Sequence, residues 1–288
     1  MWFFLALATA LFTASGDAFS KHYLRHFGSP NMALVRVLGP TVCLLPALFF
    51  WPWPPLSKKF WLTLALLYPL ETIAMLCYME AIRVSPLSVT VPYLAFTPAF
   101  IILTGRVVLG ERLSLPGMVG IFMIVLGSYF LHLAEIKKGL LEPFKATFRE
   151  KGSWLMLLVA FIYSITSVFL KVGINQSERF FFAFFYYSWL GVFMAVVLKI
   201  FFRADPKAVL RFCPRGAFLV AASQSAAVVC HVWALSLAPV AYMIAIKRLS
   251  VLFGVLIGGV FFKEKAFRVR LLGAIFMVSG VFFIAWAG

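Results

Sequence analysis

Lys247 and Arg248 are adjacent cations inside the segment 239–262, which is otherwise apolar enough to span a membrane. Each cationic side chain costs about 2.5–3.5 kcal/mol at the centre of a membrane helix. Successive residues lie roughly 100° apart around a helix, so both side chains can reach one water-filled cavity from different directions. The pair therefore predicts a site for a negatively charged group within the membrane.

Glu71 is the acidic residue expected to lie nearest to this pair. It lies about 16 Å into segment 60–80, and Lys247 lies about 12 Å into its own segment from the same side. A shift of 153 residues places Gln224 at the position of Glu71, so this depth is expected to be polar in both halves of the chain. Neighbouring cations favour a charged carboxylate, so we expect Glu71 to act as a counter-ion; carrying a coupling proton is the alternative.

Asp17 is expected to form an ordinary salt bridge with Arg36 near one membrane face, with Lys21 one turn beyond it. This structural role is preferred to a role in gating. The embedded charges then comprise two acids and three bases: Asp17, Glu71, Arg36, Lys247 and Arg248. One cation lacks a protein partner, which favours substrate binding over a purely structural role for the Lys-Arg pair.

Segment 86–105 is the most proline-rich of the apolar segments, with Pro86, Pro92, Tyr93, Thr97 and Pro98. An interior proline bends a helix and frees a backbone carbonyl, which in lipid must face protein or a wet cavity. We expect this segment to line the cavity, with Pro92 and Pro98 as structural or gating residues and Tyr93 as a candidate ligand. A simple packing kink is the alternative.

Tyr242, five residues before Lys247, is the best further candidate for a substrate ligand. Other polar residues on the apolar segments are expected mostly to form modest interhelical hydrogen bonds. They are Tyr163, Ser164, Thr166, Ser167, Tyr186, Tyr187, Ser188, Ser223, Ser225 and His231.

The composition excludes a soluble domain, because 63% of the residues are hydrophobic, 12% are charged and 33 are Phe. Ten apolar segments of roughly 20 residues follow, each long enough to cross a bilayer. They are 2–20, 31–50, 60–80, 86–105, 115–134, 153–171, 180–202, 216–236, 239–262 and 270–287. The net charge of +16 lies mainly in their connections, where lipid headgroups rather than nucleic acid account for it.

The four cysteines show no metal-binding or C-x-x-C spacing, so neither a structural metal nor a cofactor is expected. Residues 1–16 lack a basic region before the apolar run, which favours a retained helix over a signal peptide. No zinc-protease motif or nucleophile elbow is present, which argues against an enzyme.

The chain contains an internal repeat. The shift of 153 residues superimposes matching residues of the two halves, including Cys77 on Cys230, Pro86 on Pro239, Gly105 on Gly258, Glu111 on Glu264, Gly120 on Gly273 and Gly127 on Gly280. A shift of 150 places Lys21 on Lys171. Repeats are expected at 1–134 and 152–288, joined by a basic amphipathic connection at 135–151. Five helices in each repeat would insert the second half upside down relative to the first.

The sequence Gly110-Glu111-Arg112 before a helix with Gly120 and Gly127, repeated around Glu264, resembles the tandem EamA repeat of the drug/metabolite transporter superfamily. The resemblance covers nearly the whole chain and implies an all-helical membrane carrier with both termini in the cytoplasm. The Lys247-Arg248 pair resembles the pair with which triose-phosphate and nucleotide-sugar carriers bind phosphate.

The sequence therefore predicts a ten-helix, inverted-repeat secondary transporter in a bacterial inner membrane, moving a small organic anion, phosphorylated or not, by alternating access. A coupling proton or counter-substrate is a candidate partner. An exporter of amino acids or drug-like metabolites and a flippase for a phosphate-bearing lipid are the alternatives. The connections on the N-terminal side hold far fewer Lys and Arg residues than those opposite, which places both termini outside, against the family resemblance.

Overall fold

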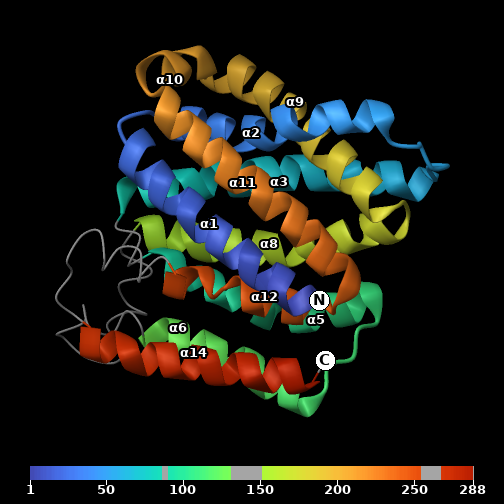
Figure 1. Ribbon diagram of the computed structural model, residues 1–288, viewed down its shortest axis with the longest axis vertical. Coiled ribbons are helices and arrows are strands. Elements are labelled where there is room, and N and C mark those ends of the chain that lie inside the picture. The colour runs from blue at the N-terminus through green and yellow to red at the C-terminus, as the bar shows by residue number, and fades with distance from the viewer. Residues whose placement is uncertain (86–89, 131–150, 254–266, 288) are drawn as a thin grey trace.

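The computed structural model describes residues 1–85, 90–130, 151–253 and 267–287, and these are helices joined by short turns (Figure 1). The first half contains α1 (Trp2–Leu24), α2 (Ser29–Phe50), α3 (Lys58–Val84), η1 (Val91–Phe96), α5 (Thr97–Leu109) and α6 (Leu115–Phe130). The second half contains α8 (Lys151–Asn175), α9 (Arg179–Phe202), α10 (Pro206–Phe212), α11 (Pro214–Leu237), α12 (Val240–Lys247) and α14 (Phe267–Ala287).

Six of the described helices are long and apolar enough to cross a membrane, namely α1, α2, α3, α8, α9 and α11. Three shorter apolar helical stretches accompany them, at Tyr93–Leu109, Leu115–Ser128 and Ile275–Ala287. Large apolar side chains such as Phe50 and Trp286 are 89% and 80% exposed, as a surface in contact with lipid requires. The all-helical membrane fold agrees with the sequence, while part of segment 239–262 and the connection 135–150 lie outside the described residues.

The helix ends follow local sequence signals. The hydroxyl of Ser57 accepts a hydrogen bond from the backbone N of Phe60 and caps α3. The Glu178 carboxylate accepts from the first backbone N–H groups of α9. Asp205 caps the seven-residue α10 in the connection between α9 and α11. Gly110 ends α5 with a φ of 67°, a left-handed conformation that glycine adopts without strain.

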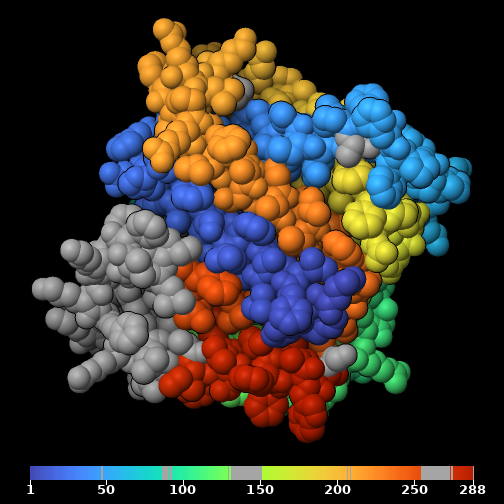
Figure 2. Space-filling view, viewed as in Figure 1, coloured from blue at the N-terminus to red at the C-terminus, as the bar shows by residue number. Residues whose placement is uncertain are grey.

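The two halves interlock through equivalent pairs of helices. The most extensive contacts join α1 to α11, α3 to α8, α2 to α9, and α6 to α14. Each pair takes one helix from each half. In the first two pairs, the first helix of one half packs against the third long helix of the other. Figure 2 shows α1 and α11 side by side on one face. The centre of the molecule is therefore an interface between the two repeats.

Glycines bring α6 and α14 into direct backbone contact. A Cβ added to Gly120 would lie 2.6 Å from the carbonyl oxygen of Gly280, and one added to Gly127 would lie 2.6 Å from that of Gly273. Residue numbers rise along one helix as they fall along the other, so the helices are antiparallel. The repeated glycines thus serve the close packing that the sequence indicated.

A lysine closes the same helix end in each half. Lys21 donates to the carbonyl oxygens of Ile82 and Ser85 at the end of α3, at 2.6 and 3.2 Å. Lys171 donates to the carbonyl oxygen of Ala238 after α11, at 2.6 Å. A cation is favourable at the carbonyl end of a helix, so the repeat retains this residue in both halves.

Of these two lysines, only Lys171 has a carboxylate partner among the described residues: its Nζ lies 2.9 Å from Glu111 of the first half. Glu111 also accepts from the backbone N of Val240, the first residue of α12. The turn after α5 therefore binds the start of the helix that carries Lys247.

One helix in each half departs from α-helical geometry at the same position. Residues 91–96 form the 3-10 helix η1, which continues directly into α5. The shift of 153 residues maps this stretch onto 244–249, where α12 ends at Lys247 and Leu249 bonds the carbonyl of Ile246. Discontinuous helices expose backbone and side chains at the centre of many transporters.

Candidate central binding pocket

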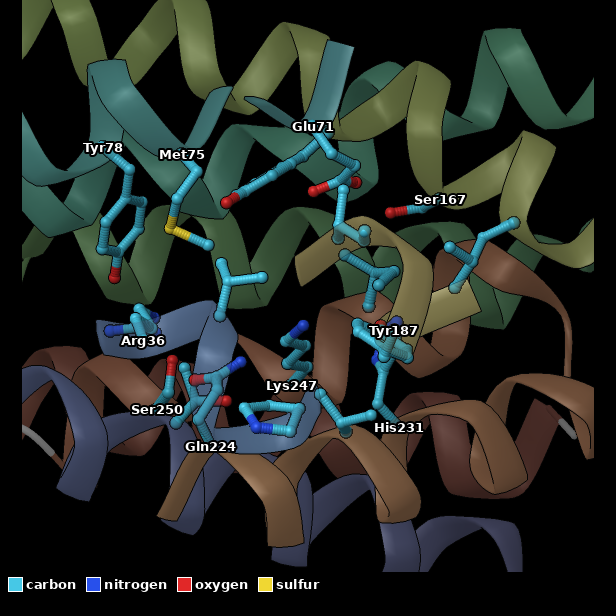
Figure 3. Close-up of a pocket in the computed structure, with 18 of the residues that line it drawn as sticks. Arg36, Glu71, Met75, Tyr78, Ser167, Tyr187, Gln224, His231, Lys247 and Ser250 are labelled. Atoms are coloured by element: carbon cyan, nitrogen blue, oxygen red, sulfur yellow. The ribbon is translucent and has the colours of Figure 1, made fainter. Parts of the chain in front are cut away.

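A pocket of about 110 Å³ lies between the two halves (Figure 3). A cavity holds a water molecule when it offers roughly 10–15 Å³ by the same measure, so this one has room for a small organic molecule. Its walls come from α1, α2, α3 and η1 of the first half and from α8, α9, α11, α12 and the residues that follow α12.

Two equivalent helix faces form opposite walls. Glu71, Met75 and Tyr78 line the pocket from α3, and Gln224, Val228 and His231 line it from α11. Both sets have the i, i+4, i+7 spacing of a single helix face. The shift of 153 residues superimposes them one for one. Equivalent residues of the two repeats therefore form opposite walls of the pocket.

Lys247 lies between these walls. In Figure 3 it stands between Glu71 on one side and Gln224 and His231 on the other. Glu71 and Asp17 are the carboxylates that act electrostatically on the Lys247 ammonium, Glu71 more strongly, and Lys247 and Thr166 both act on the Glu71 carboxylate. The structure thus brings Glu71 and Lys247, which were expected at a common depth, to one pocket, where their charges offset one another.

Arg248 is 4% exposed and has no carboxylate beside it. One guanidinium nitrogen donates to the Thr97 hydroxyl at 2.8 Å, while Nε has no hydrogen-bond partner. Within the described ranges, no Asp or Glu oxygen lies within 4 Å of a side-chain nitrogen of Arg248 or Lys247. A buried guanidinium bound by a single hydroxyl retains most of its attraction for an anion.

Asp17 and Arg36 form the predicted ion pair, with a nitrogen–oxygen distance of 2.6 Å. The Tyr78 hydroxyl donates to the second oxygen of Asp17 at 2.7 Å, and the Arg36 guanidinium lies over the Tyr78 ring. Arg36 and Tyr78 both line the pocket. The pair therefore belongs to the wall of the cavity, whereas Lys21 bonds the end of α3 instead of joining it.

Two polar groups without hydrogen-bond partners among the described residues complete the α11 wall. Oε1 of Gln224 and Nδ1 of His231 are buried and have no hydrogen-bond partner among the described residues. Lys247 and Arg248 are the charged groups that act on the His231 ring. The pocket thus combines cations with unpartnered polar atoms on the side of the second half.

The structure does not bring every predicted ligand to the pocket. The Tyr242 hydroxyl bonds the backbone N and Oγ of Ser114, in the turn before α6, at 3.2 and 3.1 Å. Tyr93 is half-buried in η1 and is not a lining residue. Pro92 and Pro98 lie in the first turns of η1 and α5, where proline fits a helix without breaking it.

Several lining residues were not predicted as site residues. Tyr78 was not identified, and His231, Tyr163, Tyr187 and Ser167 were expected to form ordinary interhelical hydrogen bonds. The spacing from Glu71 to Tyr78 and from Gln224 to His231 is the signal that would have found two of them, because seven residues return to the same helix face.

The chain is similar in sequence to known transport proteins. The family profile of the EamA-like transporter family matches residues 1–133 and again residues 150–286. An uncharacterized transporter of Methanothermobacter thermautotrophicus (strain ATCC 29096 / DSM 1053 / JCM 10044 / NBRC 100330 / Delta H) is 23% identical over 189 residues. This alignment covers 66% of the chain and 54% of the relative, so the chain spans about half of that protein's length.

A crystal structure of another protein superimposes on the whole chain. It covers 100% of this chain and 99% of its own, with a TM-score of 0.72 and 15% identity, a likeness that shows the fold alone. The two family matches together account for nearly all residues from 1 to 286, including both walls of the pocket. The chain therefore belongs to the EamA-like transporter family, and its long apolar helices agree with a multi-pass membrane protein.

Proposed function

We propose that this transporter moves a small organic anion, a carboxylate or a phosphate ester, through the pocket between its two halves. The observation that carries the proposal is Arg248, a buried guanidinium without a carboxylate partner among the described residues. Its charge would be costly to bury alone, and an anionic substrate would offset it.

The charges that line or border the pocket support a single negative charge on the substrate. Asp17 neutralises Arg36, and Glu71 offsets Lys247 across the cavity. Arg248 then supplies one net positive charge within the described residues. A carboxylate monoanion leaves the occupied pocket neutral, which suits an environment of low dielectric constant. A phosphate monoester carries about −1.5 to −2 at neutral pH and would leave the pocket negative, so this balance of charges favours the carboxylate.

Alternating access would use the interface between the repeats. The pocket lies where the two halves meet, and the 3-10 helix at 91–96 and the turn at 248–249 lie beside it. Rocking one half against the other would open the pocket to one side at a time. The Glu111–Lys171 contact, with the bond from the backbone N of Val240 to Glu111, ties the turn after α5 to α8 and to the start of α12.

The test is uptake and binding by the purified protein after the Arg248→Ala change. Truncating one partner of a buried charge pair typically costs about 2–5 kcal/mol, so the affinity for a transported anion should fall at least thirtyfold. Arg211→Ala, which removes an exposed cation from α10, is the matched control and should leave uptake unchanged. Normal uptake by folded Arg248→Ala protein would show that the pocket does not hold the anion.

A further inference from the structure

Three pocket residues present buried polar atoms without a hydrogen-bond partner in the described part of the chain. They are Gln224 through Oε1, His231 through Nδ1 and Arg248 through Nε. A buried polar atom left unsatisfied costs about 1–3 kcal/mol. Three such atoms around one cavity mark the groups that a ligand would satisfy.

These atoms differ in what they need. Arg248 Nε–H is a donor and needs an acceptor, which an anionic group supplies. Gln224 Oε1 is an acceptor. A neutral imidazole carries one donor and one acceptor nitrogen, so Nδ1 of His231 can take either role. A hydroxyl both donates and accepts, so a hydroxyl on the ligand can satisfy Gln224 and His231 alike.

The two α11 residues with unpartnered polar atoms lie on one face of that helix. Gln224 and His231 are seven residues apart, two helical turns, with the small apolar Val228 between them. Figure 3 shows both on the same side of Lys247, opposite Glu71. If the charged group of a ligand binds Arg248, the rest of the ligand would therefore lie along this face of α11.

At the equivalent position in the first half, the polar side chain has a hydrogen-bond partner within the protein. Tyr78 corresponds to His231, and its hydroxyl donates to Asp17 at 2.7 Å. Ser167 corresponds to Asp17 by the shift of 150 residues and lines the pocket from α8. Tyr78 of the first-half wall thus bonds a protein group, whereas Gln224 and His231 of the α11 wall have polar atoms without a partner in the described part of the chain.

We infer that Gln224 and His231 determine specificity, selecting an organic anion that also carries a hydroxyl group. This inference rests on the proposed function and narrows it. Arg248 binds the charged group, and the polar groups of Gln224 and His231 distinguish a hydroxylated anion from a plain alkyl anion of the same size. Sites built to hydrogen-bond a substrate hydroxyl discriminate strongly against analogues that lack it.

Matched pairs of probes test this on the full chain in lipid nanodiscs, with binding measured by calorimetry. The pairs are lactate against propionate, and glycerol 3-phosphate against propyl phosphate. In one pair or the other, the hydroxylated member should bind at least about tenfold more tightly. Gln224→Leu and His231→Leu should each reduce that ratio to below about threefold by weakening the binding of the hydroxylated member.

Two further variants separate recognition from packing. His231→Gln retains a hydrogen-bonding side chain and should restore part of the preference. Ser225→Ala, which removes a hydroxyl that bonds the Ala221 carbonyl within α11, should leave the preference intact. Both leucine variants are measured because one of them could misfold, which size-exclusion chromatography would detect. The other variant would then still test the inference.

Equal affinity of the wild-type protein for both members of each pair would overturn the inference while leaving the anion proposal standing. The same holds if a preference survives in every folded leucine variant. Failure of the wild-type protein to bind any of the four anions would instead contradict the proposed function itself. The two proposals therefore fail in different ways.

Discussion

The two halves of this transporter are alike where they support each other and different where they face the pocket. Lys21 and Lys171 each bond carbonyl oxygens at the end of the third long helix of their own half. Gly120 and Gly127 meet Gly280 and Gly273 across the α6–α14 contact. Both features satisfy backbone geometry that each repeat needs, so both halves retain them.

The pocket positions do not match in this way. Glu71 faces Gln224, Tyr78 corresponds to His231, and the counterparts of Lys247 and Arg248 are Leu94 and Ala95. The first half therefore contributes the carboxylates and the second half the uncompensated cation. Because a symmetric pocket could not present opposite charges on its two sides, this difference indicates a ligand that binds in one orientation.

The strongest test of this comparison makes the second half resemble the first. Lys247→Leu combined with Arg248→Ala copies Leu94 and Ala95 into the equivalent positions and removes both cations. We expect anion uptake in reconstituted vesicles to fall by at least a hundredfold, because the remaining pocket charges are no longer positive overall.

A conservative substitution at the first-half counterpart of Lys247 is the control for this double change. Leu94→Met changes the first-half counterpart, a 3% exposed lining residue, without altering any charge. Uptake should stay within about twofold, because volume-conserving apolar changes in a core are well tolerated. Uptake that survives the loss of both cations would contradict the assignment of different roles to the two halves.

A smaller effect is expected when the first half is made to resemble the second at Glu71. Glu71→Gln copies Gln224, removes the counter-ion of Lys247 and raises the positive charge around the pocket. Anion binding should persist, and uptake should fall about three- to tenfold, because a more positive pocket releases an anion more slowly. Uptake is measured with and without a pH gradient.

The dependence on the gradient decides the role of Glu71. A counter-ion leaves the ratio of the two rates as it is in the wild-type protein. Complete loss of gradient dependence with binding intact would identify Glu71 as a proton carrier and refute the counter-ion role.

The smallest effect is expected at the contact between the two halves that Glu111 makes with Lys171 and Val240. Glu111→Gln weakens the bonds to Lys171 and Val240, and we expect a loss of about 1 kcal/mol in the free energy of unfolding. Glu80→Gln is the matched control, since its partners Arg83 and Lys151 are 39% and 70% exposed and such pairs contribute little. Equal effects in a detergent-unfolding titration would show that the Glu111 contact is an ordinary surface contact.

The sequence predicted the helical repeats, the shared depth of Glu71 and Lys247, and the Asp17–Arg36 pair. Hydropathy and residue spacing report these features because they depend on the bilayer and on single helices. The position of Tyr242 depends on rotation about α12. Five residues turn a helix by roughly 140° beyond a full turn, so Tyr242 faces away from Lys247 and reaches Ser114.

The partners of the cations could not be predicted because they lie on distant segments. Thr97 bonds Arg248 across 151 positions of sequence, and Tyr78 bonds Asp17 across 61. Which helices meet is decided by the packing of one repeat against the other, and no local pattern encodes it. The same packing places Arg36 at the wall of the pocket, which the sequence did not predict.

The charge of the ligand can be tested without changing the protein. Binding of a carboxylate and of its neutral amide, lactate and lactamide, is compared on the wild-type chain in nanodiscs, because the two differ in charge and hardly in shape. If Arg248 supplies the uncompensated charge of the pocket, lactate should bind at least thirtyfold more tightly than lactamide. Equal affinities, or tighter binding of the amide, would contradict the central claim that the pocket recognises an anion.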